Sequence, residues 1–177
     1  MRTETKEYKI YKFDELNEAA KESAIDKLYD INVDFEWWSD TYYDAENIGL
    51  ILNEFDLGRS EVCNGVFKWG AEECADLIIK EHGVMCDTHK EATAYLKERD
   101  ALVCKYSDKK QTDKVSEDNE YEFDCECDEL NNEFLHIILE EYLSILRKEY
   151  EYLISKEAII ETIECNEYEF TEDGKIY

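Results

Sequence analysis

Carboxylates dominate one stretch of the sequence, residues 115–146, which holds eleven Asp or Glu and no Lys or Arg. A run of this kind attracts basic surfaces and divalent cations, and it repels nucleic acid and anionic membranes. Apolar and aromatic residues are interleaved with the acids throughout, which argues against disorder. We therefore expect a folded surface that binds a partner through its charge.

The candidate partner-binding residues are nine acids of this stretch and three acids further upstream. The upstream acids recur every four residues, a spacing that places them on one face of a helix predicted over residues 34–48. The candidates are Glu117, Asp118, Glu120, Glu122, Asp124, Glu126, Asp128, Glu129 and Glu133, together with Glu36, Asp40 and Asp44.

Residues 120–128 fit two local structures. Acids and apolar residues alternate strictly there, which is typical of a strand with one buried and one charged face. Phe123, Cys127, Leu130 and Phe134 instead continue the apolar stripe of a helix predicted over residues 129–153. Because no turn residue separates the two segments, the helix is the favoured interpretation and the strand the alternative.

Either geometry spaces neighbouring carboxylates on one face by roughly 6–7 Å. As a helix, the stretch would carry one charge per ~4.4 Å of its axis. One strand of duplex DNA carries one phosphate per ~3.4 Å. The similar densities suggest a surface that imitates a nucleic-acid backbone.

Metal and enzyme chemistry have weaker support in the sequence. His82, Cys86, His89, Cys125 and Cys127 do not follow the usual zinc-ligand spacing. Residues 118–129 lack the central glycine of a calcium-binding EF-hand loop. The nucleophile-elbow, phosphate-loop and H-E-x-x-H motifs are also missing. We expect no enzyme activity, no cofactor and no resident metal, with a metal-binding protein or metal-dependent enzyme as the alternative from another class.

Composition predicts one folded domain. The chain has 177 residues, 44% of them hydrophobic and 13% aromatic, with a formal net charge of −26. This size and apolar content suffice for a core. The chain has neither a basic-then-apolar leader nor an apolar run of membrane length, so we expect a cytoplasmic protein that does not bind membranes.

The periodicities predict an α+β fold, a helix-rich single domain with a small antiparallel β-sheet or hairpins. The expected helices cover residues 15–30 (capped by Asp14), 34–48 (ended by Gly49), 70–81, 89–105 (capped by Thr88), 129–153 and 156–165 (capped by Ser155). The expected β segments are a strand at 6–13, a hairpin of 50–57 with 62–69, and a hairpin at 168–177 turned by Asp173 and Gly174. Residues 107–114 are expected to form a loop.

Three phrases carry a resemblance to a known group of proteins: YKFDEL at 11–16, INVDFEWW at 31–38 and EYEFTEDG at 167–174. They resemble small acidic proteins of bacteriophages and other bacterial mobile elements, some of them described as antitoxin-like. The resemblance implies a protein that faces restriction or CRISPR defence, whose effectors bind nucleic acid through basic grooves. An antitoxin that neutralises one cognate toxin is the alternative it implies.

The leading expectation is thus an acidic nucleic-acid mimic that inhibits a host defence nuclease, as an anti-CRISPR or anti-restriction protein. Its partner would be a basic nucleic-acid-binding protein such as a Cas effector or a restriction enzyme. A net charge of −26 makes direct binding to nucleic acid unfavourable.

Overall fold

The structure is a computed structural model that describes residues 2, 9–112 and 117–177, with side chains for all of these except 108–112 and 117–119. It has the predicted α+β fold, which is rich in helices and has small antiparallel β pairs. The chain divides into two compact units, Met1–Trp37 with Lys148–Tyr177 (unit 1) and Trp38–Arg147 (unit 2). The single domain predicted from the length and composition of the chain stays a prediction.

Unit 1 joins the two ends of the chain. Its strands pair antiparallel, with Tyr11 opposite Phe170 and Lys12 opposite Glu169. A small core of Phe13, Leu16, Ala20, Ala24, Ile25, Ile159, Ile163 and Phe170 fills the unit. Its elements are β1 (Tyr11–Lys12), the 3-10 helix η1 (Phe13–Glu15), α1 (Glu18–Lys27), α6 (Lys156–Cys165) and β4 (Glu169–Phe170).

The N-terminal predictions need correction. The strand predicted at 6–13 is reduced to Tyr11–Lys12, and its residues 6–8 lie outside the described chain. Phe13 instead starts a 3-10 turn that buries Phe13 and Leu16. Helix α1 therefore begins at Glu18, and its cap is Asn17 rather than Asp14, because the Asn17 side chain accepts a hydrogen bond from the Ala20 N–H at 3.0 Å.

The C-terminal predictions are largely confirmed. Helix α6 begins as expected after Ser155, whose hydroxyl accepts from the Ala158 N–H at 3.2 Å. The turn at Asp173 and Gly174 is also present, and Gly174 has a φ of 71°. The predicted hairpin is only a single bridge between Phe170 and Ile176, because the main partner of β4 is β1.

Helix α6 ends in a Schellman motif with a non-glycine residue in the left-handed region. Glu167 has a φ of 53°, and the Tyr168 N–H donates to the Ile163 carbonyl at 3.1 Å. An L-residue in this conformation costs about 1–2 kcal/mol, which is why glycine is usual there. Glu167→Gly is expected to raise the free energy of unfolding by about 1 kcal/mol in urea titrations. Glu167→Ala is the control, and an equal gain from alanine would contradict the backbone explanation.

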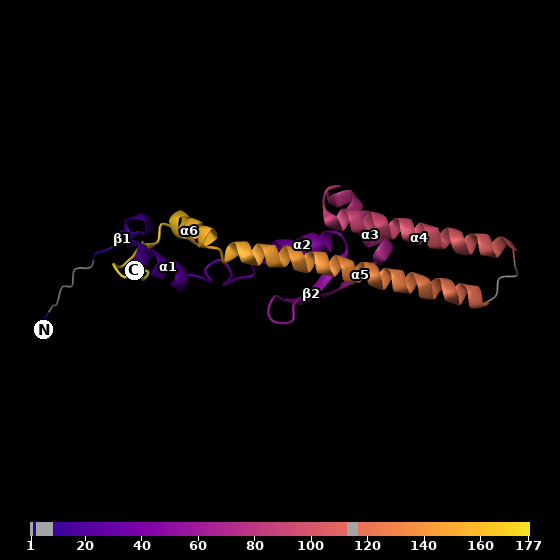
Figure 1. Ribbon diagram of the computed structural model, residues 1–177, viewed down its shortest axis with the longest axis horizontal. Coiled ribbons are helices and arrows are strands. Elements are labelled where there is room, and N and C mark those ends of the chain that lie inside the picture. The colour runs from indigo at the N-terminus through magenta and orange to yellow at the C-terminus, as the bar shows by residue number, and fades with distance from the viewer. Residues whose placement is uncertain (1, 3–8, 113–116) are drawn as a thin grey trace. The chain divides into compact units, whose positions relative to one another are not determined.

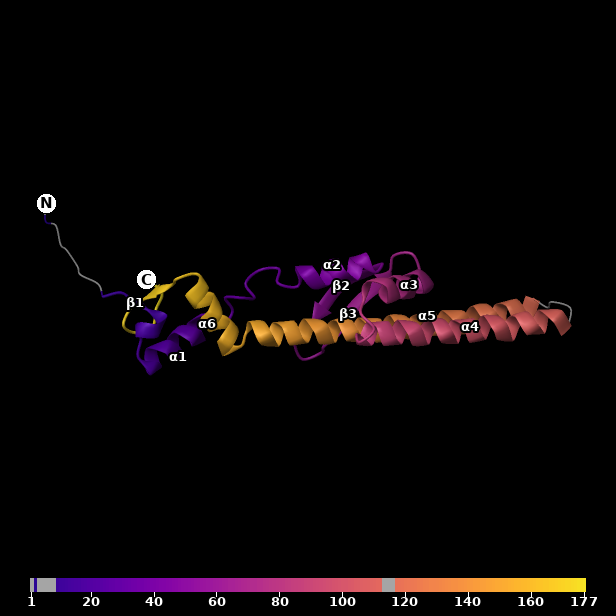
Figure 2. The same cartoon turned by 90° about the horizontal axis from the view of Figure 1, so that it is seen from above.

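Unit 2 is built from the middle of the chain. Its elements are α2 (Ser39–Asn47), β2 (Leu50–Asp56), β3 (Val62–Phe67), α3 (Ala71–Glu81), α4 (Asp87–Thr112) and the larger part of α5 (Glu117–Leu153). Helices α4 and α5 run antiparallel and side by side (Figures 1 and 2). The rings of Phe67 and Tyr95 both stack on Phe134 of α5, with centroid distances of 5.7 and 4.3 Å. Phe134 therefore joins the β-hairpin and α4 to the core.

The predicted hairpin is confirmed as the antiparallel pair β2–β3, with an irregularity between Leu52 and Glu54. The helix predicted at 70–81 is confirmed as α3, with Gly70 at its N-cap. Within unit 2, the starts of α2 and α4 were predicted wrongly. Helix α2 begins at Ser39 rather than residue 34, because Trp37 is buried and packs on Tyr150 at 5.7 Å in a preceding turn.

Helix α4 begins at Asp87, so Thr88 is a buried residue of its first turn and not its cap. The loop predicted at 107–114 is also wrong as far as Thr112, since α4 continues to that residue; 113 and 114 lie outside the described chain. Packing explains the extension, because Tyr106 is buried against Phe123 of α5 with a ring distance of 5.3 Å.

Candidate acidic interface

Residues 117–153 form one continuous helix, α5, which confirms the helical interpretation of 120–128 over the strand. Phe134 and Ile138 are fully or nearly fully buried on its inner side. The carboxylates do not share one face. Residues nine apart on a helix, such as Glu120 and Glu129, lie two and a half turns apart and so point in opposite directions.

The carboxylates on one flank of α5 are Glu120, Asp124 and Asp128, which we call the outer row. All three are exposed. No hydrogen bond or ion pair is made by any of them with the part of the chain that the structure describes. Successive members are separated by a helical rise of ~6 Å, so the row presents three free charges at regular intervals.

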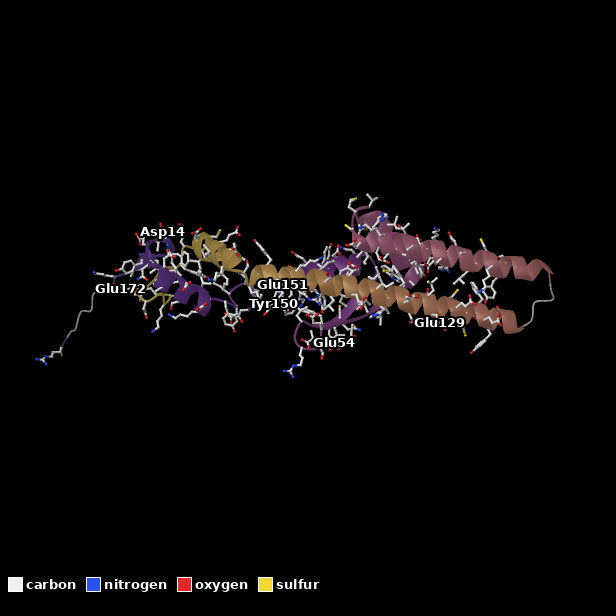
Figure 3. The ribbon with its side chains drawn as sticks, viewed as in Figure 1. Asp14, Glu54, Glu129, Tyr150, Glu151 and Glu172 are labelled. Atoms are coloured by element: carbon white, nitrogen blue, oxygen red, sulfur yellow. The ribbon has the colours of Figure 1, made fainter. Side chains whose placement is uncertain are left out.

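The other flank carries Glu126, Glu129 and Glu133, which we call the groove row because they border a groove between α4 and α5. Glu129 lies on the part of α5 that runs beside α4 (Figure 3). Glu122 precedes Glu126 by four residues, which places it on the same flank, and it is exposed. The predicted carboxylates therefore form two rows, and each row alone is sparser than a strand of phosphates.

Glu126 is neutralised within the chain. Lys105 of α4 contacts both of its carboxylate oxygens, at 2.8 and 2.7 Å, and the Tyr106 hydroxyl donates to it at 2.9 Å. The hydrogen bond to Glu126 raises the pKa of Lys105, and burial together with the same carboxylate raises the pKa of Tyr106. Glu126 is thus part of the α4–α5 contact as well as of the acidic surface.

The upstream acids do not form the predicted row. Glu36 lies before α2 and belongs to unit 1, so it is not on a helix face with Asp40 and Asp44. Asp40 is exposed in the first turn of α2, where a negative charge complements the helix dipole. Glu117 and Asp118 begin α5, but their side chains lie outside the description.

Asp44 is tied into a polar network inside unit 2. The hydroxyl of the fully buried Tyr142 donates to Asp44 Oδ2 at 2.7 Å, and Nε2 of His82 lies 3.5 Å from the same oxygen. On its other side, His82 Nδ1 is 2.8 Å from the Thr88 hydroxyl. The network connects α2, the end of α3, α4 and α5, so Asp44 has a structural role.

The contacts within this network shift the pKa values of Asp44 and Tyr142. His82 and Tyr142 hold the pKa of Asp44 below its ordinary value, although partial burial acts in the opposite direction. Burial and the neighbouring Asp44 carboxylate raise the pKa of Tyr142 strongly. The carboxylate is therefore ionised and the phenol neutral over the physiological range.

The described ranges contain no set of side chains arranged as zinc ligands. No group of three or more His, Cys, Asp or Glu residues is arranged there to hold a metal ion. His82 is engaged by Thr88, whereas Cys86 is exposed. Likewise, none of the helices within the described ranges is long and apolar enough to cross a membrane.

Comparison with known proteins supplies no relative for this chain. No protein-family model, no curated protein and no solved structure matches it. The candidate interface therefore rests on the residues and geometry of the chain itself.

The sequence reasoning missed the contribution of α4 to the acidic surface. Glu98, Leu102 and Lys105 border the groove opposite the groove row. Their spacing of four and three residues would have placed them on one helical face. The helix predicted over residues 89–105 was given no role in the site, because the acidic run of residues 115–146 alone indicated the charged surface.

Proposed function

We propose that this chain is a non-enzymatic acidic binding protein whose α5 carboxylates imitate a nucleic-acid backbone and occupy the basic cleft of a nucleic-acid-binding protein. The observation that carries the proposal is the outer row, Glu120, Asp124 and Asp128: exposed, regularly spaced and without a cation from the described residues. A defence nuclease such as a Cas effector or a restriction enzyme is the class of target with a suitable cleft.

The cost of the outer row to helix stability supports a functional interpretation of it. Like charges at four-residue spacing destabilise a helix by about 0.2–0.5 kcal/mol for each pair. The row contains two such pairs, Glu120 with Asp124 and Asp124 with Asp128. Departures from locally favourable sequence tend to mark functional sites.

The formal net charge of −26 supports the same proposal. Long-range attraction between this charge and a basic cleft would accelerate encounter and would weaken steeply with added salt. Because the groove row lies beside α4 and the outer row points in the opposite direction, a basic surface that binds the outer row would leave the groove row uncovered.

The test is inhibition of DNA cleavage by purified restriction endonucleases and Cas nucleases. The variant E120Q/D124N/D128N, called the outer-row variant, is expected to need at least about tenfold more protein for half-inhibition than the wild type. It should also unfold at slightly higher urea concentration, because about 0.4–1 kcal/mol of like-charge repulsion is removed.

The matched control is E22Q/D26N/D30N, which changes one Glu and two Asp with the same spacing. All three of these residues are exposed and belong to unit 1. The control removes the same net charge and is expected to inhibit like the wild type. An equal loss of inhibition in both variants would show that only net charge matters. Undiminished inhibition by the outer-row variant would contradict the assignment of the outer row as the binding site.

A further inference from the structure

We propose that the groove between α4 and α5 binds the apolar face of a basic amphipathic helix from a partner protein. The groove has a volume of about 400 Å³. Its floor is apolar and is formed by Ala101, Leu102 and Leu130. Ala101 is exposed and the two leucines are half-buried, so apolar surface remains accessible between the helices.

The rim of the groove is acidic on both sides. Glu98 of α4 stands on one side, and Glu129 and Glu133 of α5 stand on the other. None of the three has a hydrogen bond or ion pair with another residue in the described chain. Three free carboxylates around an apolar floor select a partner that is apolar in the middle and cationic at its edges.

One end of the groove shows how a cation is held there. The ammonium group of Lys105 lies against both oxygens of Glu126. A lysine or arginine from a partner could make the same contact with Glu129 or Glu133, which come three and seven residues later on α5. The intramolecular pair is thus an internal example of the proposed recognition.

The length of the groove favours a helix as the occupant. From Glu98 to Lys105 is seven residues, or about two helical turns and ~10 Å. Two apolar side chains at positions i and i+4 of a partner helix span about 6 Å and fit on this floor, with basic residues reaching both rims.

The inference rests on the proposed function insofar as both require a basic partner, but it places the contact on a different side of α5. It adds an apolar requirement that nucleic-acid mimicry does not have. A basic cleft lined only by phosphate-binding residues would leave Leu102 and Leu130 uncovered.

The test uses two synthetic peptides of equal composition and charge. One is a Leu/Lys peptide of about four helical turns with its leucines on one face, and the other is the same composition scrambled so that no apolar face forms. The full chain is titrated with each peptide by calorimetry at low salt. The amphipathic peptide is expected to bind at least about tenfold more tightly than the scrambled one.

The variant Ala101→Gln fills the groove without changing charge. Ala101 is exposed on α4, and glutamine is a good helix former, so the fold is expected to persist. The variant should bind both peptides equally, at the affinity of the scrambled one. The outer-row variant should keep the tenfold preference, because its substitutions lie on the other flank of α5.

Equal affinity of the wild type for the two peptides, or a preference that survives in Ala101→Gln, would overturn the inference. The two proposals fail separately. Absence of the peptide preference with nuclease inhibition intact overturns the groove proposal alone. Absence of inhibition with the preference intact overturns the mimicry proposal alone.

Discussion

Replacing Gly174 with alanine is expected to lower the free energy of unfolding by about 2–5 kcal/mol. Gly174 has a φ of +71°, and a Cβ built on it would lie 2.2 Å from the carbonyl oxygen of Ala20. That oxygen belongs to the backbone of α1, which cannot move aside as a flexible side chain does. The turn before the last bridge must therefore shift away from α1. Urea and thermal unfolding followed by circular dichroism measure the loss.

Gly83→Ala is the control for this substitution. Gly83 is outside the left-handed region, and its nearest neighbour to an added Cβ is the sulfur of Cys86 at 4.0 Å. It is expected to change stability by less than about 1 kcal/mol. A Gly174→Ala protein as stable as the wild type would contradict the close packing of this turn on α1.

The same unfolding curves test the predicted single domain. If the chain unfolds as one cooperative domain, Gly174→Ala lowers the only transition, even though residue 174 lies in unit 1. Two transitions, with only one of them shifted, would contradict the single-domain prediction.

Tyr142→Phe is expected to lower the free energy of unfolding by about 1–2 kcal/mol at neutral pH. The variant removes the 2.7 Å hydrogen bond from a fully buried hydroxyl to the Asp44 carboxylate. Hydrogen bonds to charged groups contribute about 1.5–3 kcal/mol, and the lower range is expected here because solvent reaches and screens Asp44.

The free energy of unfolding that Tyr142→Phe loses should become smaller at acid pH. The pKa of Asp44 is lowered in the folded state, so its contribution to stability is present above its unfolded pKa and declines as pH falls through the folded pKa. Phenylalanine at 142 removes one of the two groups that lower this pKa. The difference between wild type and variant should therefore shrink below about pH 4.

Tyr95→Phe is the matched control, because Tyr95 is also a buried tyrosine but donates to the neutral Asn131 side chain at 2.7 Å. Its expected loss is about 0.5–1.5 kcal/mol, without the acid dependence. Equal pH profiles for the two variants would show that Asp44 is not the source.

The parts of the fold that were predicted correctly are those with local signals. Ser155 caps α6, Gly70 precedes α3, and turn residues separate two β-rich segments that became β2 and β3. The errors arose where distant residues decide the local structure. Thr88 was predicted to cap a helix, but its hydroxyl is hydrogen-bonded to the His82 ring. Residues 107–112 were predicted as a loop, but Tyr106 packs on α5 and the helix continues.

The candidate site was predictable in composition and only partly in geometry. The acids of α5 are evident in the sequence, and helical periodicity alone would divide them into two rows once the strand alternative is removed. To predict that Glu36 lies off the helix that carries Asp40, one would have to know that Trp37 is buried. The groove required the antiparallel pairing of α4 with α5, which no local pattern specifies.

The division of the chain into units has a consequence for its synthesis on the ribosome. Unit 2 is one uninterrupted segment, so its contacts can form as soon as Arg147 has emerged, whereas unit 1 needs residues from both ends. The N-terminal 37 residues must wait until the C-terminal segment is made, with Phe13 and Leu16 lacking their partners Ile163 and Phe170 in the interval. At synthesis rates of about 5–20 residues per second, this apolar surface stays exposed for at least several seconds in every nascent chain.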